Sequence, residues 1–379
     1  MLTGIATLAD PSSGADFALA RFNPNGSLDS GFGAGGMLTT DFGDTHDVGL
    51  SVVLQPDGKI VVAGGTRHFG VRASNPYDFA LARYNANGSL DTSFGAGGHT
   101  STDFGGFDNV ATGVALQPDG KIVATGTGFD PGSGSSPPEL ELARYNTDGS
   151  LDPTFDADGR VMLGSAEGSD VAVVRGKIVA AGRSGNNIAL FRYDGAGSLD
   201  RTFGHDGIAM AILPEYALAD ELAIQPDGEI VVAGSTASNG GDFAVARFNP
   251  DGSVDPAFGA RGAATTDLQG NSYEWAGGLV LERDGKIVLA GPTVAPGSPV
   301  ADFALVRYLG AACVVPNIKQ RALAAARKAI AKANCTLGNV RRAFSARVKT
   351  GHVISQKPAA GRRLRYGAKV RLVVSRGRR

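Results

Sequence analysis

The sequence predicts a mostly β protein, a β-propeller of about six blades with an incomplete first blade, followed by a small α+β domain. Three observations indicate this fold class. The phrase DFALARF at 16–22 returns as DFALARY at 78–84 and in four looser copies, whose arginines recur every 48 to 62 residues. Each period holds four short strand-like segments, and in four of the units a PDG or RDG turn separates the middle two. From residue 313 onward, a helical pattern and a basic composition replace the repeats.

The predicted strands of one unit form antiparallel hairpins. In the turn, Pro suits the second position, Asp bonds its own backbone, and Gly accepts the positive φ that the turn requires. Phe79, Leu81 and Arg83 lie on one face of DFALARY and Ala80 and Ala82 on the other, which fits sheets stacked face to face. In the second unit the predicted strands, with the DFALARY-type strand fourth, are 99–104, 109–117, 121–126 and 140–145. An open β-solenoid of the same units is the alternative.

The first unit is predicted to be incomplete. Six arginine strands accompany only five GSLD phrases, and the chain begins near the third strand of a unit, with MLTG where other units read IVVAG. Natural sheets avoid unpaired edges, so either the ring closes imperfectly or the true start lies upstream of Met1. We favour the second interpretation, although MLTGIATLAD itself has no basic n-region and no long apolar core of a signal peptide.

A second phrase follows each of the first five arginine strands. Its copies are NPNGSLDSGFG (23–33), NANGSLDTSFG (85–95), NTDGSLDPTFD (146–156), DGAGSLDRTFG (194–204) and NPDGSVDPAFG (249–259). With PDGKIVVAG and DFALARY, this phrase resembles the delta-60 repeat family of bacterial surface-associated proteins over about residues 1–308. The resemblance implies a propeller-like repeat and does not imply a reaction.

The loop between the third and fourth predicted strands shows the largest change in length from unit to unit, relative to its own length. In a propeller these loops emerge on one face, so we expect a protein or glycan ligand there, although surface loops also drift in length without a function. The most ligand-like side chains in these loops are Arg67, His68, Arg72, Tyr77, Asp130, Arg183, Asn186 and Asn187. Trp275, in contrast, is expected to pack in the core.

Catalytic and metal-binding patterns are missing from the sequence. The five histidines occupy unrelated positions, and no GxSxG elbow, P-loop or Rossmann fingerprint occurs. Asn23, Asn25, Ser27 and Asp29 alternate like the start of a calcium loop, but local turn bonding explains these residues without a metal. We therefore predict no catalytic residues, no cofactor and no metal.

Charge divides the chain sharply. Residues 309–379 hold 18 Lys and Arg and no Asp or Glu, whereas residues 1–308 hold the other 18 basic residues and all 37 acidic ones. A short basic segment of this kind is typical of a polyanion-binding part, or of a solvated surface that docks on the acidic repeats. No apolar run reaches the length that a membrane span needs.

The basic segment has a pattern of its own. VVPN (314–317) precedes an amphipathic helix at 319–334, with Leu323, Ala326, Ile330 and Ala333 at helical spacing. Three predicted strands follow at 340–348, 352–358 and 369–375. Through VPN, the helix, VISQKPAAG and GAKVRLVVSRG, residues 313–376 resemble a PASTA domain, which implies binding to peptidoglycan without enzymatic activity. The sequence departs from that family at Gln320, where Gly is usual, and at Ala322, where Ser or Thr is usual.

We divide the chain into repeats at 1–308, a hinge at 309–312 and the basic PASTA domain at 313–379. The predicted polyanion contacts are Arg341, Arg342, Arg347, Lys349, Arg362, Arg363, Arg365, Lys369 and Arg371. Cys313 and Cys335 bracket the helix, and we predict a disulfide between them, with two unpaired thiols as the alternative. The disulfide would indicate an oxidising, extracytoplasmic setting.

Three functions remain open at this stage. The first is a non-catalytic, secreted or cell-wall-associated binding or scaffold protein, whose PASTA domain associates with peptidoglycan or another anionic wall polymer. The second is a propeller enzyme acting on wall polysaccharide. The third is nucleic-acid binding through the basic domain, which is disfavoured because its only aromatic residues are Phe344 and Tyr366 and no nucleic-acid motif occurs.

Overall fold

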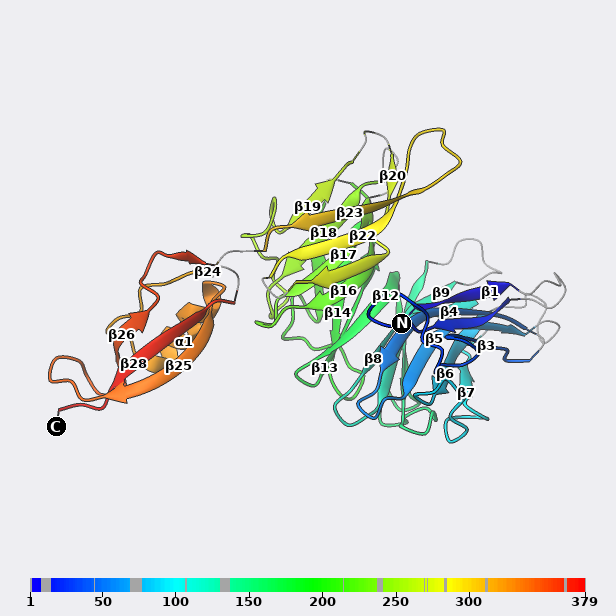
Figure 1. Cartoon of the computed structure of the whole chain (residues 1–379), viewed down its shortest axis with the longest axis horizontal. Coiled ribbons are helices and arrows are strands. Elements are labelled where there is room, and N and C mark those ends of the chain that lie inside the picture. The colour runs from blue at the N-terminus through cyan, green and yellow to red at the C-terminus, as the bar shows by residue number, and fades with distance from the viewer. Residues whose placement is uncertain are drawn as a thin grey trace. The chain divides into compact units, whose positions relative to one another are not determined.

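A computed structural model describes residues 2–7, 15–43, 45–68, 77–105, 108–129, 137–213, 215–236, 241–268, 270, 272–282, 285–310, 313–364 and 367–378. This part of the chain is mostly β, with one helix near its C-terminal end (Figure 1). The chain forms two compact units. The first holds residues 1–222, the second holds residues 254–379, and the segment 223–253 is divided between them.

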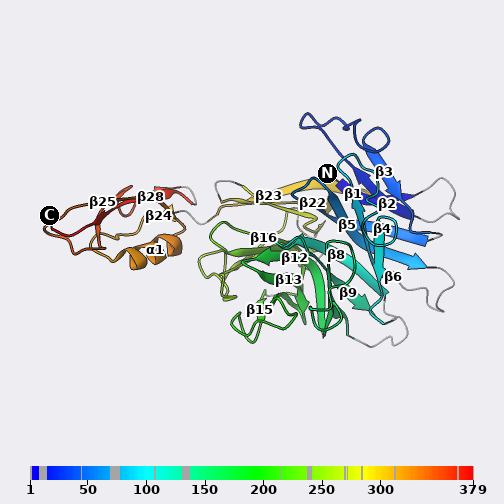
Figure 2. The same cartoon turned by 90° about the horizontal axis from the view of Figure 1, so that it is seen from below.

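Six antiparallel sheets follow one another along the described repeats (Figures 1 and 2). The first has three strands, β1 (Leu2–Thr7), β2 (Ala15–Ala20) and β3 (Met37–Thr40). The next two have four strands each, in chain order β4 (Thr45–Leu54), β5 (Ile60–His68), β6 (Tyr77–Tyr84) and β7 (His99–Thr102), then β8 (Asp108–Leu116), β9 (Ile122–Phe129), β10 (Glu139–Tyr145) and β11 (Arg160–Gly164).

The later sheets repeat this pattern. The fourth and fifth contain β12 (Ala166–Val174), β13 (Lys177–Ser184), β14 (Asn187–Tyr193) and β15 (Ile208–Ala211), then β16 (Ala217–Ile224), β17 (Ile230–Thr236), β18 (Phe243–Phe248) and β19 (Ala263–Thr266). In the sixth, β20 (Tyr273–Glu274), β21 (Gly278–Leu281) and β23 (Asp302–Tyr308) all pair with β22 (Ile287–Val294). Repeated four-stranded sheets confirm the predicted propeller-like fold.

The DFALARY strand is the third of its sheet, and its prediction as the fourth strand is wrong. The chain folds back after this strand through a bridge between Tyr84 and Leu90, and β7 then pairs with β6, with Thr102 opposite Phe79. The segment predicted to open each unit therefore closes the preceding sheet. Consequently the first sheet lacks one described strand relative to the others, and not the two that the sequence indicated.

The PDG hairpins form as predicted. Gly58 donates its N–H to the carbonyl of Gln55 at 2.9 Å, and its φ of +86° lies in the left-handed region that glycine tolerates best. A second glycine, Gly64 on β5, lies against a bulge in β4. A Cβ at Gly64 would come within 1.7 Å of the carbonyl oxygen of Val48, so only glycine fits this position.

The recurring arginine joins the two repeated phrases to each other and to the next sheet. Arg83 donates through Nε to Asp91 of the GSLD phrase at 2.7 Å and through Nη1 to the carbonyl of Thr147, which follows β10. The Phe94 ring lies under its guanidinium, 4.6 Å from Cζ. Arg144 makes the same contacts one sheet later, to Asp152 and Gly195. This shared role explains why both phrases recur together.

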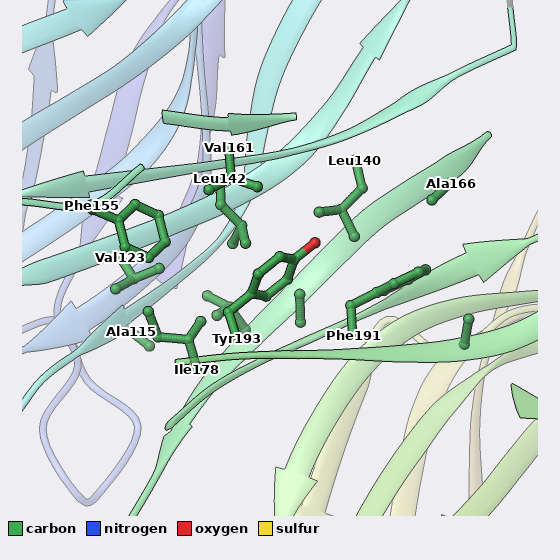
Figure 3. Packing of buried hydrophobic residues seen from close by; sticks show 13 residues of the cluster. Ala115, Val123, Leu140, Leu142, Phe155, Val161, Ala166, Ile178, Phe191 and Tyr193 are labelled. Carbon is green, nitrogen blue, oxygen red and sulfur yellow. The ribbon is translucent and has the colours of Figure 1, made fainter. Parts of the chain in front are cut away.

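Apolar side chains fill the space between successive sheets. The cluster in Figure 3 joins β9 and β10 to β13 and β14, and it includes Val123, Leu142, Ile178 and Tyr193. All four side chains are fully or almost fully buried. Trp275, expected in the core, is instead 37% exposed, because it alternates along the chain with Glu274 and Ala276, which are the buried residues.

The C-terminal domain contains the helix α1 (Leu323–Lys332) and a sheet of β25 (Thr336–Ala343), β28 (Lys369–Ser375) and β26 (Val353–Lys357) in that order. Two short strands, β24 (Cys313–Val314) and β27 (Arg363–Leu364), pair with each other in a separate two-stranded sheet. Helix α1 lies along one side of the domain (Figure 2), where Ala326 and Ile330 pack with Val370, Leu372 and Val374. Cys313 and Cys335 form the predicted disulfide. Within the described residues, no helix is long and apolar enough to cross a membrane.

The helix begins where the sequence departs from the PASTA pattern. Gln320 has a φ of +63°, the left-handed conformation that explains why Gly is usual there. Ala322 is the N-cap and makes no side-chain hydrogen bond to the helix. Two of the three strands predicted here match, whereas the strand predicted at 340–348 is in fact β25, which starts earlier and ends at Ala343.

Candidate functional site

A groove of about 460 Å³ lies on the sheet of the C-terminal domain. Its lining residues are Asn339, Arg341, Ser355, Gln356, Lys357, Arg371, Leu372 and Val373. Arg341, Lys357 and Arg371 are exposed to solvent. Since residues 309–379 contain no Asp or Glu, no acidic side chain of this domain neutralises these three cations. The groove therefore presents positive charge to solvent.

Strand alternation places the cations together. Leu372 and Val374 of β28 are buried on the side of α1, so Arg371 and Val373 point to the opposite face. Lys357 of β26 lies directly opposite Arg371, and Arg341 of β25 lies beside Val373. Like charges opposite each other destabilise a sheet, and a bound anion would relieve this repulsion.

Of the seven predicted polyanion contacts whose side chains the structure describes, Arg341 and Arg371 line the groove. Arg342 follows Arg341 on β25 and points to the other side, while Arg347, Lys349, Arg362 and Lys369 are exposed at other places on the domain. The Arg363 side chain and Arg365 lie outside the described residues.

Lys357 was not among the predicted polyanion contacts, although it lies within the strand predicted at 352–358. In the structure Lys357 is the last residue of β26. The period-two spacing of Ser355 and Lys357 is the signal that could have identified it. The neighbouring Gln356 has a structural role: it donates Nε2–H to the carbonyl of Pro316 at 2.8 Å and accepts the N–H of Ile318 at 2.9 Å.

The predicted loop-face residues separate into two local clusters. Arg67 of β5 stacks on the Tyr77 ring, 4.4 Å from its centroid, and the Tyr77 hydroxyl is hydrogen-bonded to Nδ1 of His46 at 2.8 Å. His46 was not among the predicted loop-face residues. Arg72, Asp130 and the His68 side chain lie outside the described residues.

The second cluster lies on the fourth sheet. Arg183 forms an ion pair with Glu167, whose Oε2 accepts the Nε–H of Arg183 at 2.8 Å, and the guanidinium covers the Tyr216 ring. The hydrogen bond that Arg183 donates to the Glu167 carboxylate raises the pKa of Arg183. Asn187 opens β14, and the carbonyl of Asn186 accepts the N–H of Ala217. The Arg183 side chain thus has a structural partner within the sheet.

A second pocket, of about 490 Å³, opens at the other end of the strands, where the PDG turns and GSLD phrases lie. Its lining residues include Gln55, Lys59, Arg83, Ser93 and Asp148. Lys59 and Arg83 both bind Asp91 there, at 2.7 Å each. Lys59 and Arg83 are therefore already paired with a carboxylate, unlike Arg341, Lys357 and Arg371 in the groove of the C-terminal domain, which we call the basic groove.

The alternating Asn and Asp side chains of the GSLD phrase bond to their own turns. Asn25 Oδ1 accepts the N–H and the hydroxyl of Ser27, and Asp29 Oδ1 accepts the N–H of Gly31. This is the local bonding expected from the sequence.

Two family models match the chain. A model described as a domain of unknown function (DUF5122) beta-propeller matches residues 3–32, 55–94, 117–155, 176–203 and 225–258. A PASTA domain model matches residues 314–376. No curated protein matches the chain.

Several solved structures are weakly similar to the chain. A GH43 endo-arabinanase from Bacillus licheniformis is 12% identical with a TM-score of 0.32, covering 81% of this chain and 89% of that one. A glycosyl hydrolase from Bacteroides ovatus is 14% identical with a TM-score of 0.34, covering 69% and 84%. The Bacillus subtilis arabinanase Arb43A is 10% identical with a TM-score of 0.31, covering 80% and 88%. Similarities this weak assign no activity to this chain.

Proposed function

We propose that this chain, in which DUF5122 beta-propeller repeats are followed by a PASTA domain, is a non-catalytic binding protein that attaches to an anionic polymer of the cell wall. The observation that carries the proposal is the groove in which Arg341, Lys357 and Arg371 share one face of a domain without acidic residues. PASTA domains generally bind peptidoglycan or related wall ligands. The carboxylates of wall peptides and the phosphates of wall polymers are ligands that such a groove suits.

The disulfide between Cys313 and Cys335 supports a location outside the cytoplasm, because structural disulfides persist in oxidising compartments. The repeats would then present their loops to a protein or glycan ligand, while the PASTA domain holds the chain at the wall. A non-catalytic role is supported by the partners of the predicted loop-face residues: Arg183 is paired with Glu167, and Tyr77 with His46 and Arg67.

Co-sedimentation of the full chain with purified peptidoglycan across a salt series tests the proposal. We expect binding that weakens steadily as salt rises, because exposed charges are screened. Replacing both groove arginines, as Arg341→Gln with Arg371→Gln, should weaken binding by about tenfold or more at low salt. Arg347→Gln with Arg378→Gln removes the same charge from exposed sites outside the groove and is the matched control.

Two results would contradict the proposal: absence of sedimentation at low salt, or equal losses in the groove and control variants. Duplex DNA serves as a competitor in the same assay. If DNA displaces peptidoglycan at equal charge concentration, the groove is a nucleic-acid site and the wall assignment is wrong.

A further inference from the structure

Three carboxyl groups meet where the fifth sheet faces the sixth. Asp242 directly precedes β18, Asp267 directly follows β19, and Glu274 ends β20. One oxygen of each carboxyl group lies within 4.8 Å of those of the other two. Glu274 is buried, Asp242 is half-buried and Asp267 is exposed, so the cluster can be reached from solvent on one side.

The same arrangement occurs where the first sheet faces the second, at Asp16, Asp41 and Asp47. The positions correspond one by one. Asp16 and Asp242 precede the Phe of the DFALARY phrase, and Asp41 and Asp267 follow the Thr that ends the last strand of a sheet. Asp47 and Glu274 each lie opposite a threonine of the neighbouring strand, Thr66 and Thr293. The cluster is thus a repeated feature of the fold.

The fold does not need an acid at the position of Asp47 and Glu274. In the second to sixth sheets this residue directly precedes the one whose carbonyl oxygen lies against a glycine of the neighbouring strand. In the third, fourth and fifth sheets the same position holds Asn109, Ala166 and Ala217. Those sheets form without a carboxylate there. Sheet formation therefore does not explain the two complete triads.

Glu274 also has an oxygen without a partner. The hydroxyls of Ser272 and Thr293 both donate to its Oε1, the latter at 2.8 Å. The whole Glu274 side chain is buried, with 0% exposure, and its Oε2 accepts no hydrogen bond within the described part of the chain. At the other triad, the buried Thr66 hydroxyl opposite Asp47 likewise has no partner among the described residues. A buried carboxylate oxygen without a donor is costly unless a cation compensates it.

The three carboxyl groups of the first triad lie close enough to repel one another when they are ionised. A divalent cation between the three groups would remove this repulsion.

We propose that Asp242, Asp267 and Glu274 bind a calcium ion, and that Asp16, Asp41 and Asp47 form a second site of the same design. The class of cation follows from the ligands. All of them are oxygens, with no His or Cys, which suits a hard cation, and calcium tolerates irregular sets of carboxylate and carbonyl oxygens better than magnesium does. The ligands of each site come from three separate segments of the chain, so no contiguous pattern in the sequence predicts them.

Trp275 provides a direct test. It is the only tryptophan in the chain and adjoins Glu274. Terbium, which takes calcium sites, should therefore emit when the metal-free full chain is excited at the red edge of tryptophan absorption, and calcium should quench the emission by displacement. Asp267→Asn changes an exposed ligand and should lower terbium affinity by at least about tenfold. Asp206→Asn, at an exposed carboxylate outside both triads, is the matched control and should leave the emission unchanged.

Calorimetry with calcium then counts the sites. We expect two sites in the natural chain and one in either Asp267→Asn or Asp41→Asn, with each variant checked for folding by its melting curve. No terbium emission, equal emission in Asp267→Asn and the natural chain, or fewer than two calcium sites would overturn the proposal.

Discussion

At the scale of single residues, one hydroxyl pair recurs between neighbouring sheets. The tyrosine that ends the DFALARY-type strand is hydrogen-bonded to the threonine that ends the preceding sheet. The pairs are Tyr84 with Thr40, Tyr145 with Thr102 and Tyr308 with Thr266, at 2.8 Å each. Burial raises the pKa of Tyr84 to about 12, although the Thr40 hydrogen bond acts in the opposite direction. The hydroxyl is therefore neutral and needs its partner.

Tyr193 breaks this pattern. The threonine position of the preceding sheet holds Leu163, opposite Leu140, and the buried Tyr193 hydroxyl has no partner within the described residues. In Figure 3 its oxygen points toward Leu140 among apolar side chains. We expect Tyr193→Phe to stabilise the chain by about 1 kcal/mol, because it removes an unsatisfied buried hydroxyl. Urea unfolding followed by circular dichroism measures this difference.

Tyr145→Phe is the matched control for this prediction. It removes a hydroxyl that does have a partner, so the same assay should show destabilisation by about 1 kcal/mol. If both variants changed the free energy of unfolding in the same direction, the partner position would not be the deciding feature.

At the scale of elements, the start of α1 is suboptimal at two neighbouring positions. Gln320 has a positive φ, and the N-cap Ala322 offers no side-chain acceptor. We expect Gln320→Gly to stabilise the C-terminal domain by about 1 kcal/mol, and Ala322→Thr to add about 1 kcal/mol through a cap hydrogen bond. Thermal unfolding of the full chain, with the transition of this domain resolved by calorimetry, measures both changes.

The control for the helix prediction is Ala324→Thr, on the exposed first turn of α1. Threonine has lower helix propensity than alanine and caps nothing there, so this variant should destabilise the domain slightly. Stabilisation by Thr at both positions would show that capping is not the cause.

Strands were more predictable than their order. PDG turns and period-two alternation identified β8, β9 and β10 close to their observed bounds, because hairpins depend on local turn chemistry. The predicted position of the DFALARY strand within its sheet was wrong. That position depends on which strand the chain pairs with after the GSLD phrase, and no local pattern encodes that choice. In the basic groove, Arg341 and Arg371 could be selected from charge, but only the register revealed that Lys357 lies opposite Arg371.

At the scale of the whole molecule, two sets of buried carboxyl groups act on stability in opposite directions as the pH changes. Burial by itself would raise the pKa of Asp91, but hydrogen bonds from Lys59 and Ser93 outweigh burial and leave the pKa well below its ordinary value. Asp152 is held in the same way by Lys121 and Thr154. A depressed pKa stabilises the fold above the unfolded pKa of about 4, and this stabilisation is lost as the pH falls.

The second set behaves in the reverse way. Burial, with a smaller effect of Glu221, raises the pKa of Asp170 and Asp220 from 3.8 to about 7. Burial also raises the pKa of Glu141 from 4.5 to about 8. These groups hold protons in the folded chain that they lose in the unfolded chain. The stability that they contribute is present below the unfolded pKa and is lost as the pH rises through the folded pKa.

The two sets together place the stability maximum on the acid side of neutrality. We expect the melting temperature of the repeats to be highest at about pH 4–6 and to fall towards pH 8. Asp220→Asn should flatten the fall towards pH 8 and raise the melting temperature there, because Oδ2 of Asp220 is buried without a partner among the described residues. Asp206→Asn, at an exposed carboxylate, should leave the profile unchanged. A melting temperature that rises continuously from pH 5 to pH 8 would contradict the raised pKa values of the buried carboxyl groups.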